Sequence, residues 1–74
     1  MDEIKKSIYS SRVLAAVGKL SAERAPEVAL RKGVRQEVGL TDGELDEILE
    51  DLLAREFIET GRTINDTYIK IKHT

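Results

Sequence analysis

Apolar side chains recur at helical spacing near the start of the chain, and this pattern predicts a helix over residues 3–20. One stripe of this helix consists of Tyr9, Val13, Ala16, Val17 and Leu20. Ile4, Ile8 and Ala15 lie on another side of the helical wheel, so the helix either bends near Ser10 or has two apolar faces. The two isoleucines then either pack against another part of the domain or form the seam of a dimer, because an apolar stripe on one helix needs a partner to bury it.

A second, shorter helix is predicted over residues 30–38, after a connection at residues 21–27 in which Pro26 blocks a continuous helix. Its apolar positions, four residues apart, are Leu30, Val34 and Val38. Gly39 is expected to end it in the left-handed conformation that favours glycine. Residues 28–30 form either a very short strand or the start of this helix.

The third predicted helix, over residues 42–56, has the strongest signals. Thr41 and Glu44 have the spacing of a capping box, in which the threonine hydroxyl accepts from a backbone amide while the glutamate reaches back to the cap. One apolar arc follows, formed by Leu45, Ile48, Leu49, Leu52 and Leu53. These residues are expected to face the core.

A hairpin is predicted over residues 57–72, because its second half alternates strictly between polar and apolar residues. With a two-residue turn at Asn65-Asp66, the register pairs Ile64 with Thr67, Arg62 with Ile69, Thr60 with Ile71 and Glu59 with Lys72. The face of this hairpin that we expect to be buried carries Ile58, Ile69 and Ile71, and opposite charges pair on the other face. Asn-Asp is a weaker turn signal than Asn-Gly, so a longer loop starting at Gly61 remains an alternative.

This order of elements resembles the winged helix-turn-helix family. The resemblance is carried by the turn Val38-Gly39-Leu40-Thr41 and by the run Leu53-Ala54-Arg55-Glu56-Phe57-Ile58 that leads from the third helix into the hairpin. It covers roughly half of the chain. It implies an α+β, mainly α fold with three helices and a C-terminal β-hairpin wing. It also implies DNA binding, with the third helix in the major groove and the wing on the minor groove or the backbone.

Composition sets limits on the class of protein. The chain has 74 residues, of which 41% are apolar and 35% charged, as in one small globular domain. A domain of this size buries only about 60% of its unfolded surface, and the absence of cysteine excludes disulfides and thiolate zinc sites as added support. The N-terminus lacks the apolar core of a signal peptide, and no apolar run approaches the roughly 20 residues of a membrane span. We therefore expect a cytoplasmic protein that does not contact membranes.

The third predicted helix has the wrong charge for reading DNA. Seven acidic residues and one basic residue, Arg55, lie between Asp42 and Glu56. The candidate partner face of this helix consists of Asp46, Glu47, Glu50 and Asp51. Phosphates would repel these carboxylates, which have no nearby cation in the helix to offset them, and base edges are normally read by arginine, lysine, asparagine or glutamine. This face is therefore either a binding site for a protein partner or a solvated surface, and contact with the major groove is disfavoured.

Basic residues lie on the other elements, although the net charge of the chain is −2. Arg24 lies in the connection before the second helix. The candidate nucleic-acid contacts are Arg31, Lys32, Arg35, Arg62, Lys70 and Lys72. Phosphate contacts need only positive charge at the surface, so DNA binding led by the wing and the second helix is compatible with an acidic third helix. Ordinary solubility explains the same residues, and the uneven distribution of charge also suits self-association or an oppositely charged protein.

No catalytic, cofactor or metal motif is present in the sequence. The single histidine, His73, has no neighbours at the spacing of a catalytic relay or a zinc site, and none of the five isolated glycines precedes a Lys-Ser/Thr pair. We therefore expect a non-enzymatic winged-helix module without cofactor, metal or small-molecule substrate. It would act in regulation or assembly through contacts with another protein or with itself, as a homodimer whose seam contains Ile4 and Ile8. The alternative is a transcriptional regulator that contacts the DNA backbone through the wing and the second helix.

Overall fold

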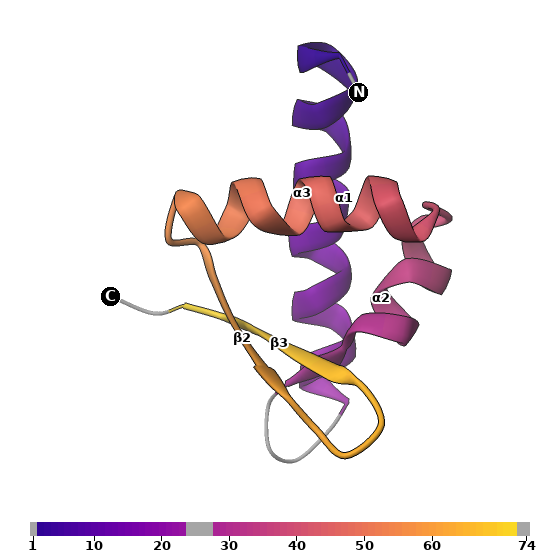
Figure 1. The fold of residues 1–74 in the computed structure, drawn as a ribbon, viewed down its shortest axis with the longest axis vertical. Helices are drawn as coiled ribbons and strands as arrows, with labels where there is room; N and C mark the ends of the chain where they lie inside the picture. Colours follow the sequence, from indigo (N-terminus) through magenta and orange to yellow (C-terminus); the bar gives the residue numbers. More distant parts are fainter. Residues whose placement is uncertain (1, 24–27, 73–74) are drawn as a thin grey trace.

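The structure is a computed structural model that describes residues 2–23 and 28–72. Arg24, Pro26 and His73, which entered the sequence-based predictions, lie outside these residues. The elements, in chain order, are α1 (Glu3–Ala22), β1 (Ala29–Leu30), α2 (Arg31–Val38), α3 (Asp42–Ala54), β2 (Ile58–Arg62) and β3 (Thr67–Ile71). The strands form one antiparallel sheet in the order β1-β3-β2 (Figure 1). This α+β, mainly helical arrangement, with three helices followed by a hairpin, has the layout of a winged helix.

The first helix is continuous and ends at Ala22, two residues later than predicted. The side chain of Asp2 caps its start by accepting a hydrogen bond of 2.8 Å from the Lys5 amide. Because α1 is not interrupted near Ser10, it has two apolar faces rather than a bend. One face is buried and contains Val13, Ala16 and Val17. On the other face, Ile4 and Ile8 remain 76% and 48% exposed, so they do not pack against the rest of the domain.

The second helix begins one residue later than predicted, because Leu30 belongs to the short strand β1 and pairs with Tyr68. Gly39 ends α2 as predicted, with a left-handed φ of 71°. Leu30 has no side chain that can cap the helix start. Instead, the Lys32 amide donates to the carboxylate of Asp66 in the turn of the hairpin, over 3.3 Å. The wing thus caps the N-terminus of α2 from a distant point in the sequence.

The third helix begins with the predicted capping box between Thr41 and Glu44. It ends at Ala54, two residues earlier than predicted. The chain reverses there because Glu56 adopts a φ of 62°, and the amide of Phe57 donates to the carbonyl of Leu52 over 3.0 Å. This is the bonding pattern of a Schellman cap, with a glutamate at the position where glycine is usual.

The register predicted for the hairpin is wrong. The observed pairs are Ile58 with Ile71, Glu59 with Lys70, Thr60 with Ile69, Gly61 with Tyr68 and Arg62 with Thr67. The turn is therefore a four-residue loop, residues 63–66, rather than Asn65-Asp66 alone. Thr63 explains the difference, because its amide and its hydroxyl both donate to the Asp66 carbonyl, over 2.7 and 2.9 Å. The register differs by two positions, so each side chain keeps the face that was predicted for it.

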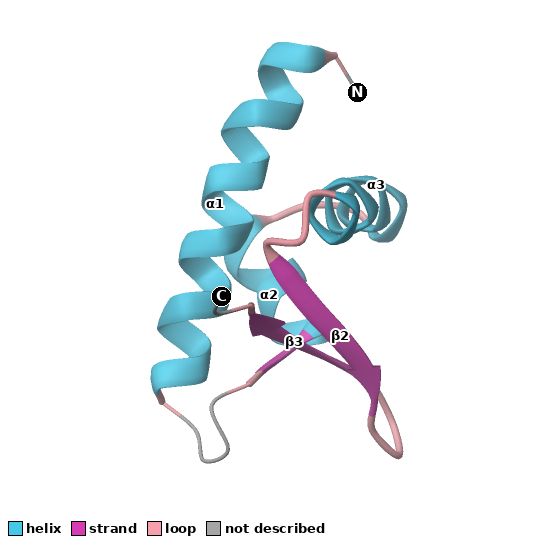
Figure 2. Cartoon of the chain, turned by 90° about the vertical axis from the view of Figure 1, so that its left-hand side faces the viewer, coloured by secondary structure: helices cyan, strands magenta, loops and turns pink. Residues whose placement is uncertain are grey.

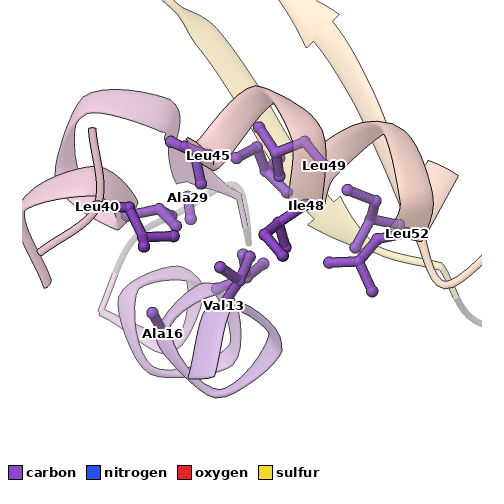
Figure 3. Packing of buried hydrophobic residues seen from close by; sticks show 12 residues of the cluster. Val13, Ala16, Ala29, Leu40, Leu45, Ile48, Leu49 and Leu52 are labelled. Carbon is purple, nitrogen blue, oxygen red and sulfur yellow. The ribbon is translucent and has the colours of Figure 1, made fainter. Parts of the chain in front are cut away.

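The core lies between α1, α3 and the sheet. Figure 3 shows Ile48 of α3 pointing toward Val13 of α1. The buried cluster consists of Val13, Ala16, Val17, Ala29, Val34, Leu40, Leu45, Ile48, Leu49, Leu52, Ile58 and Ile69. Leu53 does not belong to this cluster and is 39% exposed. Of the five α3 residues predicted to face the core, Leu53 is therefore the one that does not. Since α2, α3 and the sheet all pack on one side of α1, its other side is uncovered (Figure 2).

Candidate functional site

The four acidic residues predicted to form a partner face lie on the side of α3 that is away from its buried leucines. Asp46 and Glu50 are exposed, whereas Glu47 and Asp51 are half-buried. Asp51 lies 3.2 Å from Arg55 and 4.0 Å from Lys6 of α1. Asp46 receives a hydrogen bond of 2.6 Å from Arg31 of α2. The sequence-based expectation concerned cations within the helix itself. The structure adds cations from neighbouring elements, Lys6 of α1 and Arg31 of α2, which offset part of this negative charge.

Arg31 links the start of α2 to the start of α3. One guanidinium nitrogen donates to the side chain of Asp42 over 2.9 Å. The other donates to the Asp42 carbonyl over 3.1 Å and to the Asp46 carboxylate over 2.6 Å. Hydrogen bonding to Asp42 raises the pKa of Arg31, and the same bond lowers the pKa of Asp42. Arg31 thus serves the packing of the two helices, and its side chain is only 21% exposed.

Two further candidate phosphate contacts are also engaged within the chain. Arg35 donates to the Leu40 carbonyl over 3.4 Å and lies 3.6 Å from Asp42. Lys72 lies 3.4 Å from Glu56. These two residues and Arg31 form half of the predicted nucleic-acid set. A phosphate would have to compete with their carboxylate partners, so their contribution to DNA binding is smaller than the sequence suggests.

The other half of that set consists of Lys32, Arg62 and Lys70. All three are exposed, and no ion pair of theirs is found within the described part of the chain. Arg62 pairs with Thr67 in the hairpin and Lys70 pairs with Glu59, so alternation places the two cations on opposite faces of the sheet. Lys32 lies beside the wing through its amide bond to Asp66. The three cations therefore surround the wing and do not form one continuous patch.

Exposed apolar residues form a second kind of candidate surface. Besides the predicted pair Ile4 and Ile8, the structure leaves Phe57 48% exposed and Ile64, in the hairpin loop, 98% exposed. Sequence reasoning missed Ile64 because the two-residue turn placed it inside the ladder, whereas the true loop contains it. The sequence signal for this exposed position is an apolar residue, Ile64, among the polar residues of the loop.

A groove of about 370 Å³ separates the N-terminal half of α1 from the C-terminal end of α3. Its lining includes Lys6, Ser7, Ser10, Leu14, Asp51 and Phe57. The groove combines hydroxyls, charged side chains of both signs and three apolar side chains, those of Leu14, Leu52 and Phe57. It was not predicted, since it depends on how α3 crosses α1. No charge of one sign dominates it, so it favours no particular ligand.

Neither a metal centre nor a membrane segment is found among residues 2–23 and 28–72. Within these ranges, no three histidine, cysteine, aspartate or glutamate side chains are grouped closely enough to hold a metal ion. None of the helices there combines the length and the apolar character needed to cross a membrane. No protein-family model matches the chain, and no curated protein or solved structure is significantly similar to it.

Proposed function

We propose that this chain is a non-enzymatic module of the winged-helix type that acts in the cytoplasm through protein–protein contacts, in regulation or in assembly. The observation that carries the proposal is the uncovered apolar face of α1, where Ile4 and Ile8 are 76% and 48% exposed. Contiguous apolar patches on a protein surface mark interaction sites, and these two isoleucines lie one turn apart on the same face of α1. This face is the proposed contact surface.

The charge on α3 supports the same proposal, because it opposes the usual mode by which a winged helix binds DNA. The exposed carboxylates Asp46 and Glu50 would lie among phosphates if α3 entered the major groove. Arg31 offsets part of this charge, but it is held on the α2 side of the helix by Asp42 and Asp46. It is therefore not available to contact base edges.

Fluorescence anisotropy with a random-sequence DNA duplex, measured over a salt series, tests this proposal. We expect affinity no better than millimolar even at low salt, because the net charge is −2 and the third helix is acidic. The variant Ile4→Glu with Ile8→Glu should lose any self-association seen by light scattering and keep the helical signal in circular dichroism. Micromolar binding to DNA with a steep dependence on salt would contradict the proposal.

Binding to the DNA backbone through the wing and α2 is a second candidate function. It is favoured by the cations Lys32, Arg62 and Lys70, which are exposed and have no ion-pair partner in the described part of the chain. If these cations contact phosphates, Arg62→Gln and Lys70→Gln should each reduce the salt slope of binding by about 1. The matched control is Lys5→Gln at the far end of α1, which should leave the slope unchanged.

A further inference from the structure

The uncovered face of α1 extends much further than its two isoleucines. Its members alternate at steps of four and three residues, which is the spacing of a coiled-coil seam. They are Ile4, Ile8, Ser11, Ala15, Gly18 and Ala22, and all of them are exposed. We call these six residues the α1 seam. It carries no charge and runs along the whole helix, directly opposite the buried residues Val13, Ala16 and Val17.

We infer that the occupant of the α1 seam is the same seam of a second copy of this chain, with the two helices parallel. This inference rests on the proposed function and names its partner. A second helix can reach the seam without collision, because the rest of the domain lies on the other side of α1 (Figure 2). A face that is used twice across a twofold axis is the usual interface of small homodimers.

Gly18 provides an independent reason for a close partner. Glycine weakens the interior of a helix relative to alanine, so its presence there needs a cause. The structure offers none within the domain, since a Cβ added at Gly18 would meet nothing within 4 Å. Gly33 and Gly61 differ, because a Cβ at either position would contact a neighbouring side chain. Small residues on an exposed helix face allow a second helix to approach closely, and Ser11, Ala15 and Ala22 of the seam are small as well.

The charges that flank the seam determine the direction of the second helix. One edge carries the cations Lys5, Arg12 and Lys19, and the other carries the neutral residues Ser7 and Leu14, followed by Ser21, which is buried in its own domain. In an antiparallel pair, edges of the same kind meet, so the cations of the two copies would face each other. In a parallel pair, the cationic edge of each helix meets the neutral edge of its partner. Repulsion between like charges therefore favours the parallel pair.

The same cations favour a second copy over an unrelated acidic helix. Lys19 donates to Glu37 of its own chain over 2.7 Å, and Arg12 lies over the ring of Tyr9 at 5.3 Å from its centre. Two of the three flanking cations are thus engaged beside the seam. An acidic partner would have to compete with Glu37 for Lys19, whereas an uncharged seam leaves this ion pair in place.

The size of the seam predicts a weak dimer. A helix of 20 residues is roughly 30 Å long, and a strip about 10 Å wide along it covers roughly 300 Å² in each copy. The total of roughly 600 Å² lies below the ~1,000 Å² of a typical stable interface. We therefore expect a weak dimer that dissociates into monomers at low micromolar concentration.

Sedimentation equilibrium of the full chain and two glycine variants tests the partner. Gly18→Leu places a bulky side chain in the seam where the monomer has open space, so it should keep the fold and weaken the dimer at least tenfold. The matched control is Gly43→Leu, at a glycine on α3 whose added Cβ also meets nothing within 4 Å, and it should leave the dimer unchanged. A chain that stays monomeric up to 1 mM, or a Gly18→Leu variant that dimerises like the wild type, would overturn the inference.

Cysteine cross-linking tests the direction, because the chain contains no cysteine of its own. Ala22→Cys should form an intermolecular disulfide under mild oxidation if the helices are parallel. In an antiparallel pair the two introduced thiols would be roughly 27 Å apart, at a rise of 1.5 Å per residue. Efficient cross-linking only when Ile4→Cys is combined with Ala22→Cys would establish the antiparallel pair and overturn the inferred direction. Neither result bears on DNA binding, so failure of this inference is distinguishable from failure of the proposed function.

Discussion

Removal of the Asp66 carboxylate should destabilise the domain although Asp66 lies in the hairpin loop. The two carboxylate oxygens accept from two backbone amides, that of Thr67 over 2.8 Å and that of Lys32 over 3.3 Å. The second bond is the only side-chain cap shown for the N-terminus of α2 in the described part of the chain. Asp66→Ala leaves both amides without these partners. The bonds between Thr63 and Asp66 that close the loop involve the backbone of Asp66 and do not depend on its carboxylate.

The expected cost follows from the two bonds. Loss of a capping side chain costs about 0.5–2 kcal/mol, and the length of the Lys32 bond places it near the lower end. An ordinary hydrogen bond such as that of Thr67 adds about 0.5–1.5 kcal/mol. We therefore expect Asp66→Ala to lower the free energy of unfolding by about 1–2 kcal/mol. For a domain of this size, that loss lowers the Tm by roughly 5–15 °C.

Urea and thermal unfolding followed by circular dichroism measure this effect. Asp66→Asn keeps one oxygen acceptor and should lose about half as much stability. The control is Asn65→Ala, because Asn65 is exposed and makes no side-chain hydrogen bond within the described residues. Hydrogen exchange at the Lys32 amide should also accelerate in Asp66→Ala. An Asp66→Ala variant as stable as Asn65→Ala, with unchanged exchange at Lys32, would refute the cap.

Three further changes test other parts of the structure by the same unfolding measurements. A Cβ at Gly61 would overlap the ring of Tyr68. Gly61→Ala should therefore lower the free energy of unfolding by about 1–3 kcal/mol in the wild type, and by much less in a Tyr68→Thr background. Equal losses in the two backgrounds would contradict this packing. Glu56→Gly should raise the free energy of unfolding by up to about 1 kcal/mol, because a φ of 62° strains a residue with a Cβ. The ion pair that is lost, with Lys72, is exposed and contributes little. A loss of stability would show that the backbone at Glu56 is not strained. The hydrogen bond from Arg31 lowers the pKa of Asp42. The stability that this bond contributes is therefore present above the usual aspartate pKa of 3.8, and it is lost as the pH falls through the lowered pKa. Arg31→Gln should therefore reduce the loss of stability that the wild type shows below about pH 4. An unchanged dependence of stability on pH in this range would show that the Arg31–Asp42 pair does not cause that loss.

The local signals in the sequence predicted the helices well, because each depends on neighbouring residues. Thr41 and Glu44 are three positions apart and form their capping box without help from the rest of the chain. Gly39 likewise ends α2 through its own conformation. The register of the hairpin failed because two registers that differ by two residues bury the same isoleucines. The bonds between Thr63 and Asp66 belong to the observed register, and a pattern of apolar residues does not contain that information.

The candidate surfaces were predicted in part, for a similar reason. The hydrophobic pattern places Ile4, Ile8 and Ala15 on a separate apolar face. It does not show that Ser11, Gly18 and Ala22 continue this seam, since small side chains give little signal in a search for hydrophobic spacing. Arg31 was assigned to phosphates because the sequence does not show that α3 brings Asp42 and Asp46 to it. Contacts between elements that are distant in the chain decide which charges remain available, and these contacts require the fold.

The weight-average mass of the chain as a function of concentration shows directly whether the α1 seam binds a second copy. If the α1 seam is a contact surface for a second copy, sedimentation equilibrium between about 5 μM and 1 mM should show the mass rising from 8.3 kDa toward twice that value. The same experiment on Ile4→Glu with Ile8→Glu should give 8.3 kDa throughout. A wild-type mass that stays at 8.3 kDa over the whole range would contradict the account.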